Sequence, residues 1–208
     1  KGLIALKDIS FSLRSGEIFA IAGVAGNGQR ELAEALAGLR KITSGKVYMS
    51  GRDITEANAK ERISLGISFI PEDRLKMGLI PGMNLKQNAI LKSFREPEYS
   101  RFGFLRDKPI KALTERFVET HDIKNGGIGL PVGMMSGGNQ QKLLIAREVH
   151  CEPALIIAAY PVRGLDIGAA ESINNILMEQ RNKGACVLLI SEELDEIFEM
   201  SDRVAVLC

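Results

Sequence analysis

Short apolar runs and longer segments with helical spacing alternate along much of the chain. Residues 3–13 alternate around Ile9, Phe11 and Leu13, which predicts a half-buried strand. Residues 17–22 predict a second strand, and RELAEALAGL (residues 30–39) predicts a helix that ends near Gly38. The next predicted elements are a strand at 46–50, a helix at 59–65 and a strand at 67–71.

The pattern changes between about residue 75 and residue 150. β-Branched runs become scarce, and Ile110, Leu113, Phe117 and Val118 form one apolar stripe at helical spacing. Residues 95–106 are polar and aromatic and predict a loop. We therefore expect this region to be a mainly helical insertion.

Strands and helices alternate again in the last third of the chain. The predicted elements are a strand at 155–159, a helix at 169–181, a strand at 185–190, a helix at 194–200 and a strand at 203–207. Strands that alternate with helices in this way are typical of a parallel sheet with crossover helices. The sequence thus predicts an α/β fold.

Composition and charge exclude several classes of protein. The 208 residues include 27 Lys and Arg against 26 Asp and Glu, and 45% are hydrophobic, which is too many for a disordered chain. A net charge of +1 argues against a nucleic-acid binder, which would carry a basic excess. No apolar run reaches the length of about 18 residues that a membrane helix needs, so we expect no direct membrane insertion. The N-terminal residues lack a signal-peptide core, and three scattered cysteines predict reduced thiols.

A glycine-rich segment, GVAGNGQ, lies between the second strand and the following helix. Gly23, Gly26 and Gly28 occupy the context of a phosphate-binding loop, whose backbone N–H groups turn inward around an anion. The nest that we expect to bind a phosphate runs from Gly26 through Asn27 to Glu31. The alternative is a strand–turn–helix corner that merely uses glycine.

Two positions of this loop depart from the G-x-x-x-x-G-K-[ST] pattern. Gln29 stands where a lysine would reach the phosphates, and Arg30 stands where a hydroxyl would bind magnesium. Arg30 is a candidate for a partial substitute cation.

Three further segments have the order and spacing of a nucleotide-binding protein. They are MSGGNQQK (135–142) before an apolar helix, LIIAAYPVRGLD (155–166), and LLISEELDEI (188–197). Each segment alone is a weak signal, because a Ser-Gly-Gly turn is commonly just a helix N-cap. Their order after a glycine loop is specific.

With these segments, nearly the whole chain resembles the nucleotide-binding domain of ABC transporters. SGGNQQK resembles the signature motif, RGLD resembles the D-loop, and IPEDR lies at the Q-loop position with Glu72 in place of glutamine. The combination is similar to the second half of tandem sugar-type ABC ATPases, and most similar to the nucleoside branch. The resemblance implies a P-loop NTPase fold with a RecA-like parallel core, an antiparallel β subregion and an inserted helical subdomain.

The resemblance also implies domain boundaries. We expect a single domain over residues 1–208, with a core at about 1–74 and 151–208 and a helical subdomain at about 75–150. The chain would be excised from a longer tandem protein.

Measured against the family pattern, the positions that would carry hydrolysis are altered. Ala159 stands where the metal-linked aspartate belongs, Tyr160 where the catalytic glutamate belongs, and Glu192 where the switch histidine belongs. Alanine has no metal ligand, tyrosine is a poor base at neutral pH, and a carboxylate repels phosphate. Losing two or three charge-assisted hydrogen bonds, each worth about 1.5–3 kcal/mol, would weaken a micromolar site to about millimolar. We expect weak ATP binding, no metal ligands and no hydrolysis in this half's own site.

The signature retains its residues. In the family, two domains meet head to tail, and each ATP lies between one domain's phosphate loop and the other's signature. The resemblance assigns contacts with the partner's ATP to Ser136, Gly137, Gly138, Asn139 and Gln140, with Asp166 in the D-loop. Ser136 is expected to cap its helix and to donate to the γ-phosphate, while Mg²⁺ would lie only at the partner's site.

The expected partners are a second ATPase half in the same polypeptide and the transmembrane permease subunits, at the cytoplasmic face of the membrane. The solute would be a nucleoside or a simple sugar. An autonomous ATPase and a docking module with a vestigial loop are the alternatives. His121 and His150 have no metal-ligand spacing and are expected to fill packing or surface roles.

Overall fold

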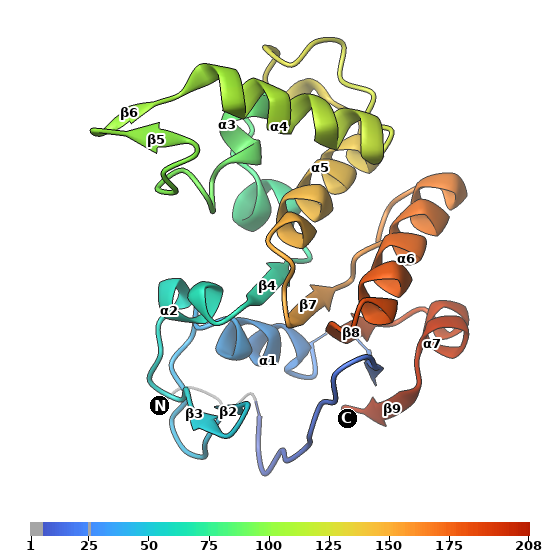
Figure 1. Cartoon of the computed structure of the whole chain (residues 1–208). Coiled ribbons are helices and arrows are strands. Elements are labelled where there is room, and N and C mark those ends of the chain that lie inside the picture. Colours follow the sequence, from blue (N-terminus) through green and yellow to red (C-terminus); the bar gives the residue numbers. More distant parts are fainter. Residues whose placement is uncertain (1–5, 25) are drawn as a thin grey trace. The chain divides into compact units, whose positions relative to one another are not determined.

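The computed structural model describes residues 6–24 and 26–208 and divides into two compact units (Figure 1). The sheet unit comprises residues up to Glu72, Glu152–Pro161 and Asn174–Cys208. The helical unit comprises Asp73–Cys151 and Val162–Ile173. Residues 162–173, which the sequence assigned to the core, group with the helical unit because this segment places Ala169 against Gly138.

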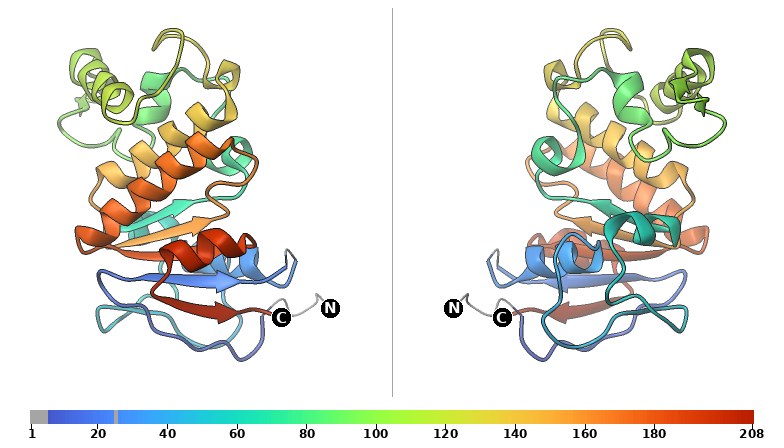
Figure 2. Two further views of the ribbon diagram at one scale, coloured as in Figure 1. Left: turned by 90° about the vertical axis from the view of Figure 1, so that its right-hand side faces the viewer. Right: turned by 90° about the vertical axis from the view of Figure 1, so that its left-hand side faces the viewer.

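The sheet unit is built on five parallel strands in the order β4-β7-β8-β1-β9. Their bounds are Ile18–Ala22 (β1), Ile67–Ile70 (β4), Leu155–Ala159 (β7), Cys186–Ser191 (β8) and Arg203–Val206 (β9). The three central strands are almost continuously apolar and buried, as expected for a sheet covered on both faces. Figure 2 shows α1 (Gln29–Leu36) and α7 (Leu194–Met200) on opposite faces. The predicted α/β class is confirmed.

The strand register decides which segments meet at the carboxyl edge of the sheet. Ala22 of β1 pairs with Ser191 of β8, and Ala159 of β7 pairs with Ile190. The residues that follow these strands are the glycine loop, Tyr160 and Glu192. Because ligand sites of parallel α/β sheets lie beyond the carboxyl ends of the strands, this edge is where sequence-distant site residues gather.

A buried arginine holds the end of α1 to the next helix of the sheet unit. α2 (Ala59–Ser64) begins with a capping box between Asn58 and Glu61, and its Arg62 is only 2% exposed. The Arg62 guanidinium donates to the carbonyl of Leu36 at 2.7 Å. It also donates to the carbonyls of Ile54, Thr55 and Ala57. Burial lowers the pKa of this group, and the carbonyls take the place of a counter-charge.

The N-terminal strand predicted at residues 3–13 is wrong wherever the structure describes it. Residues 3–5 lie outside the described residues, and 6–13 form no strand. The alternation instead reflects packing, because the Phe11 ring stacks on Phe19 with centroids 5.4 Å apart. The antiparallel region consists of β2 (Tyr48–Met49) paired with β3 (Arg52–Asp53).

The helical unit follows the predicted apolar stripe. In α4 (Asp107–Thr120), Ile110, Leu113 and Phe117 are buried, and Val118 is half-buried. The other elements are the π-helix η1 (Arg74–Gly78), α3 (Leu85–Ala89), the 3-10 helix η2 (Val132–Met134), α5 (Gly137–His150) and the first part of α6 (Ile167–Asn182).

Two details of the helical unit bear on the sequence predictions: the first contradicts one, and the second agrees with one. Residues 95–106, expected to be a loop, contain the short hairpin β5 (Ser100–Arg101) and β6 (Phe104–Leu105). The rings of His121 and His150 both pack edge-on against Phe117. Every helix among the described residues is too short or too polar to cross a membrane.

Candidate functional site

The glycine loop joins β1 to α1 with the backbone geometry of a phosphate loop. Gly26 and Gly28 have φ angles of 104° and 98°, a region that residues with a side chain rarely adopt. Gly28 is the N-cap of α1 and provides no side-chain cap. Gly23 is tightly enclosed, since a Cβ there would lie 2.5 Å from the carbonyl oxygen of Leu207.

Gln29, at the position of the expected lysine, is turned into the loop. Its side chain is buried, with 1% of the residue exposed, and Nε2 donates to the carbonyl of Val24 at 3.0 Å. The same Nε2 lies 2.6 Å from where a Cβ on Gly23 would stand. Within the described chain, the buried Oε1 of Gln29 has no hydrogen-bond partner. The amide therefore occupies the inner side of the loop.

Arg30 is engaged away from the loop. Its Nε donates to Glu34 Oε1 at 2.7 Å, one helical turn further on, and Arg40 holds the other carboxylate oxygen. Burial alone would raise the pKa of Glu34, but the hydrogen bonds from the two arginines outweigh it and lower that pKa. The hydrogen bond and the charge of Glu34 raise the pKa of Arg30, and the negative charges of Glu31 and Glu72 add to this. The expected substitute cation is thus surrounded by carboxylates of its own chain.

The two altered positions after β7 belong to the apolar core. Ala159 and Tyr160 are 3% and 6% exposed and pack in a cluster with Phe19 and Leu32. Tyr160 has a positive φ of 50°, a strained conformation for an aromatic residue, and its backbone N–H donates to the carbonyl of Ile190 at 2.7 Å. A buried phenol ring at this place gives neither a metal ligand nor a base.

At the end of β8, Ser191 and the Glu196 side chain are both buried. The Ser191 hydroxyl donates to Glu196 Oε2 at 2.5 Å, and burial raises the pKa of Glu196. Glu192, at the switch position, is exposed.

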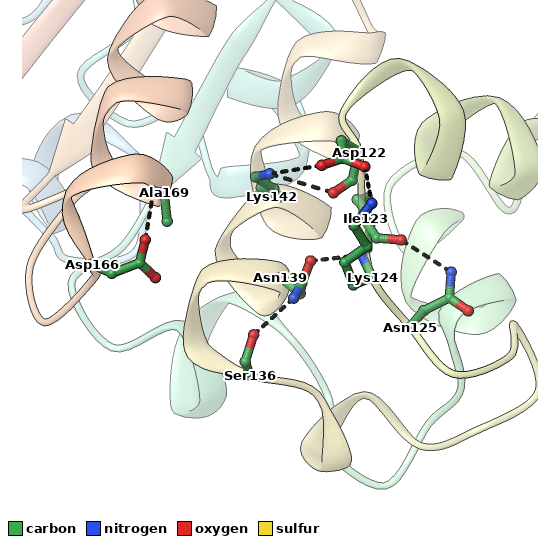
Figure 3. A network of polar contacts seen from close by, with 9 residues as sticks. All are labelled: Asp122, Ile123, Lys124, Asn125, Ser136, Asn139, Lys142, Asp166 and Ala169. Atoms are coloured by element: carbon green, nitrogen blue, oxygen red, sulfur yellow. Dashed lines mark hydrogen bonds and ion pairs between the residues drawn. The ribbon is translucent and has the colours of Figure 1, made fainter.

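The signature segment provides the start of α5 in the helical unit. Ser136 is the N-cap, but its side chain makes no capping bond within the described residues, so the predicted side-chain cap is wrong. Instead, Asn139 Nδ2 donates to Ser136 Oγ at 2.8 Å, and Asn139 Oδ1 accepts from the Lys124 N–H at 2.7 Å (Figure 3). Because Lys124 donates to Oδ1, the amide orientation is fixed and Ser136 Oγ must accept. The hydroxyl hydrogen of the exposed Ser136 remains available to a ligand.

Two glycines of the signature are closely approached by other side chains, Gly138 by a short one and Gly137 by the end of a long, flexible one. A Cβ on Gly138 would lie 3.0 Å from Ala169 Cβ, and one on Gly137 would lie 2.7 Å from the guanidinium of Arg74. Asp166 accepts from the Ala169 N–H at 2.9 Å, which fixes the D-loop beside Gly138. Gln140 is buried and donates to the Met135 carbonyl, so it serves the turn.

Sequence reasoning missed Arg74 and Lys124. Arg74 stands in the IPEDR segment, but nothing in the spacing indicates that η1 packs against the start of α5. Its guanidinium brings a positive charge to a helix N-terminus, where the dipole is also positive. Such an arrangement favours an anion.

Comparison with known proteins identifies the family. The family model described as ABC transporter matches residues 6–162. The chain belongs to this family. A glucose import ATP-binding protein of Haloferax volcanii, TsgD13, is 42% identical over 99% of the chain and 38% of its own length. The guanosine import ATP-binding protein NupO of Bacillus subtilis and the nucleoside import ATP-binding protein NupA of Lactococcus lactis are 41% and 40% identical over the whole chain.

The chain spans only part of these curated relatives, since it covers 41% of the length of NupO and of NupA. Solved ABC cassettes share the fold. A dimeric cassette in a post-hydrolysis state, bound to ADP and Pi, has a TM-score of 0.81 at 22% identity, with 98% of this chain and 86% of that chain covered. A nucleotide-free cassette has a TM-score of 0.80 at 23% identity, with coverage of 98% and 81%.

Proposed function

We propose that this chain is a degenerate nucleotide-binding half of an ABC importer for a nucleoside or simple sugar. It binds nucleotide weakly in its own loop and supplies its signature to the ATP site of a partner half. The observation that carries this proposal is the contrast between Ser136, whose hydroxyl hydrogen is available, and Gln29, whose amide is buried in its own loop.

The residues of the own loop do not fit Mg-ATP. Gln29 carries no charge, Arg30 is paired with Glu34, and Ala159 has no ligand atom. Among the described residues, no cluster of three or more His, Cys, Asp or Glu side chains could hold a metal ion. We therefore derive no hydrolytic step at this loop.

The signature residues fit a phosphate group. The first-turn N–H groups of α5 and the Ser136 hydroxyl are donors, and donors at a helix N-terminus suit an anion. Arg74 adds positive charge beside Gly137. In a head-to-tail pair, this chain would hold the γ-phosphate of the partner's ATP through these groups, and Mg²⁺ would be held by the partner's residues.

The names and lengths of the relatives support the remaining partners. They are import ATP-binding proteins more than twice as long as this chain, which leaves room for a second ATPase half in one polypeptide. Importers need membrane-embedded permease subunits, so we propose that the chain works at the cytoplasmic face of the membrane. The segment from Glu72 through η1 would transmit movement, because η1 contacts the signature helix α5.

Substitution of Ser136 by arginine in the complete transporter tests this function. We expect ATPase activity to fall about a hundredfold or more, since the bulky cation would fill the space of the γ-phosphate and each tenfold loss corresponds to about 1.4 kcal/mol. Ser44→Arg, at an exposed bend, is the matched control and should leave the rate unchanged. The chain itself should stay folded with Ser136→Arg, because the Ser136 side chain caps no N–H within the described residues.

Normal ATPase activity with Ser136→Arg would mean that the signature does not contribute to the partner's ATP site. The chain would then be better described as a docking module without a role in ATP binding.

A further inference from the structure

We infer that Gln29 is the residue that closes the phosphate loop to anions, by filling it with its own side-chain amide. This inference deepens the proposed function, because it names the cause of the weak binding in this half's own site. The absence of a lysine charge is only one cause of weak binding. The Gln29 amide would also occupy the space for a phosphate, and removing this amide would raise the affinity for an anion more than the missing cation lowers it.

The inner side of the loop has little space beside Gln29. Gln29 Nε2 lies 3.0 Å from the Val24 carbonyl oxygen and 2.6 Å from the position of a Cβ on Gly23. The side chain therefore reaches back from the first residue of α1 across five residues to the start of the loop. With 1% of Gln29 exposed, solvent does not reach the amide, so a phosphate oxygen could enter only after the amide leaves.

The polarity of the buried amide also opposes an anion. A glutamine that served only to fill a core would be expected to pair both ends of its amide, yet Gln29 Oε1 is buried without a partner in the described chain. Oε1 belongs to the same amide as the Nε2 that lies against Gly23 and Val24, so this acceptor is buried close to the loop backbone. It would repel the oxygen atoms of an incoming phosphate.

The neighbouring polar side chains of the loop do not compensate. The Arg30 guanidinium is directed to Glu34. Asn27, on the exposed side of the loop, donates to the Leu207 carbonyl at 3.3 Å. The side chains that could have bound an anion are thus used to brace the loop.

Inorganic tripolyphosphate is the probe that tests this inference, measured by calorimetry with the wild-type chain and three variants. Gln29→Ala should bind tripolyphosphate about tenfold more tightly than wild type, the equivalent of about 1.4 kcal/mol. The reason is that the inner side of the loop no longer contains the amide. Gln29→Glu has the same shape and should bind no better than wild type. Gln180→Ala truncates another buried glutamine of the sheet unit and should also show no gain, which excludes general loosening as the cause.

Equal affinity of Gln29→Ala and wild type would overturn the inference. If Gln29→Ala does not fold, the wild-type chain decides by NMR. The Gln29 side-chain amide protons, assigned by their absence in Gln29→Glu, should exchange slowly with solvent when no anion is added. Fast exchange would contradict a closed loop.

The two proposals fail separately. The tripolyphosphate titration rests on the difference between Gln29 variants that all keep Ser136, and the ATPase assay of Ser136→Arg keeps Gln29 unchanged.

Discussion

The phosphate loop and the signature are two versions of the same backbone device, a glycine turn that leads into a helix. They differ in how their side chains use hydrogen bonds. In the loop, the groups of Asn27, Gln29 and Arg30 are bonded to the chain itself. In the signature, the Asn139 amide is bonded so that the Ser136 hydroxyl hydrogen is left over.

This difference teaches that a helix N-terminus does not by itself make an anion site. In any helix, the N–H groups of the first turn have no partner within the helix, but only the signature combines them with an exposed hydroxyl and an adjacent guanidinium. In the loop, the side chains of Asn27, Gln29 and Arg30 are bonded to groups of their own chain instead. Anion binding at a helix N-terminus depends on the hydrogen-bond donors that the folded chain does not pair with its own acceptors.

The largest effect should come from Asn139→Asp. The new carboxylate would keep the acceptor for the Lys124 N–H, but Ser136 would then have to donate to it. This would remove the hydrogen that, in the proposed function, bonds the partner's ATP. Losing one hydrogen bond to a charged group costs about 1.5–3 kcal/mol, so the ATPase rate of the transporter should fall about tenfold to a hundredfold.

The same substitution at Asn27, in the phosphate loop, is the control. Asn27→Asp should leave the ATPase rate of the transporter unchanged, because the loop does not take part in hydrolysis. A loss comparable to that of Asn139→Asp would contradict the functional difference between the loop and the signature. Urea unfolding should show little change for Asn139→Asp, since an acidic residue suits the first turn of a helix.

A middle-sized effect is expected for the glycines, by different causes in the two regions. Gly138→Val should lower the free energy of unfolding by about 1–3 kcal/mol through overpacking against Ala169, and Ala169→Gly should restore part of it. Gly26→Ala has open space within 4 Å among the described atoms but a φ of 104°. Gly26→Ala should therefore lower the free energy of unfolding by about 1–2 kcal/mol through backbone strain. Truncating a neighbouring side chain should not relieve this strain.

Urea titrations of the three variants measure these costs. A full rescue of Gly26→Ala by a neighbouring truncation would show that the loop is limited by space after all.

The smallest effect concerns pH in the sheet unit. Burial raises the pKa of Glu196 above its ordinary value of 4.5, while the Ser191 hydroxyl opposes this and Glu193 adds to it. The folded chain therefore binds this proton more firmly than the unfolded chain, so its contribution to stability is present below pH 4.5 and is lost as pH rises through the raised folded value.

Glu196→Gln should remove this loss and raise the free energy of unfolding near neutral pH relative to the wild-type chain. Denaturation curves between about pH 4.5 and 8 provide the measurement. A wild-type stability that increases with pH over the window, with no difference in Glu196→Gln, would show that this carboxylate is not held protonated.

Most of the secondary structure followed from local pattern. The strand at 155–159 and the helix at 194–200 have the bounds that periodicity predicts, because a continuous apolar run and a 3.6-residue spacing are local properties. The failures at residues 6–13 and 95–106 have one cause. Whether an alternating segment joins a ladder depends on a partner strand, and the sequence does not state which backbone will face it.

The sequence by itself determined the fold class, the glycine loop and the residue types at 29, 159, 160 and 192. These features depend only on which residues the chain contains and in what order, so they can be identified without the folded structure. Only the tertiary structure decided that Gln29 folds back onto Val24, that Arg30 pairs with Glu34, and that Asn139 orients Ser136. These hydrogen-bond partners depend on which donors and acceptors lie within about 3 Å of each other. Side-chain rotamers and packing in the folded chain determine those distances.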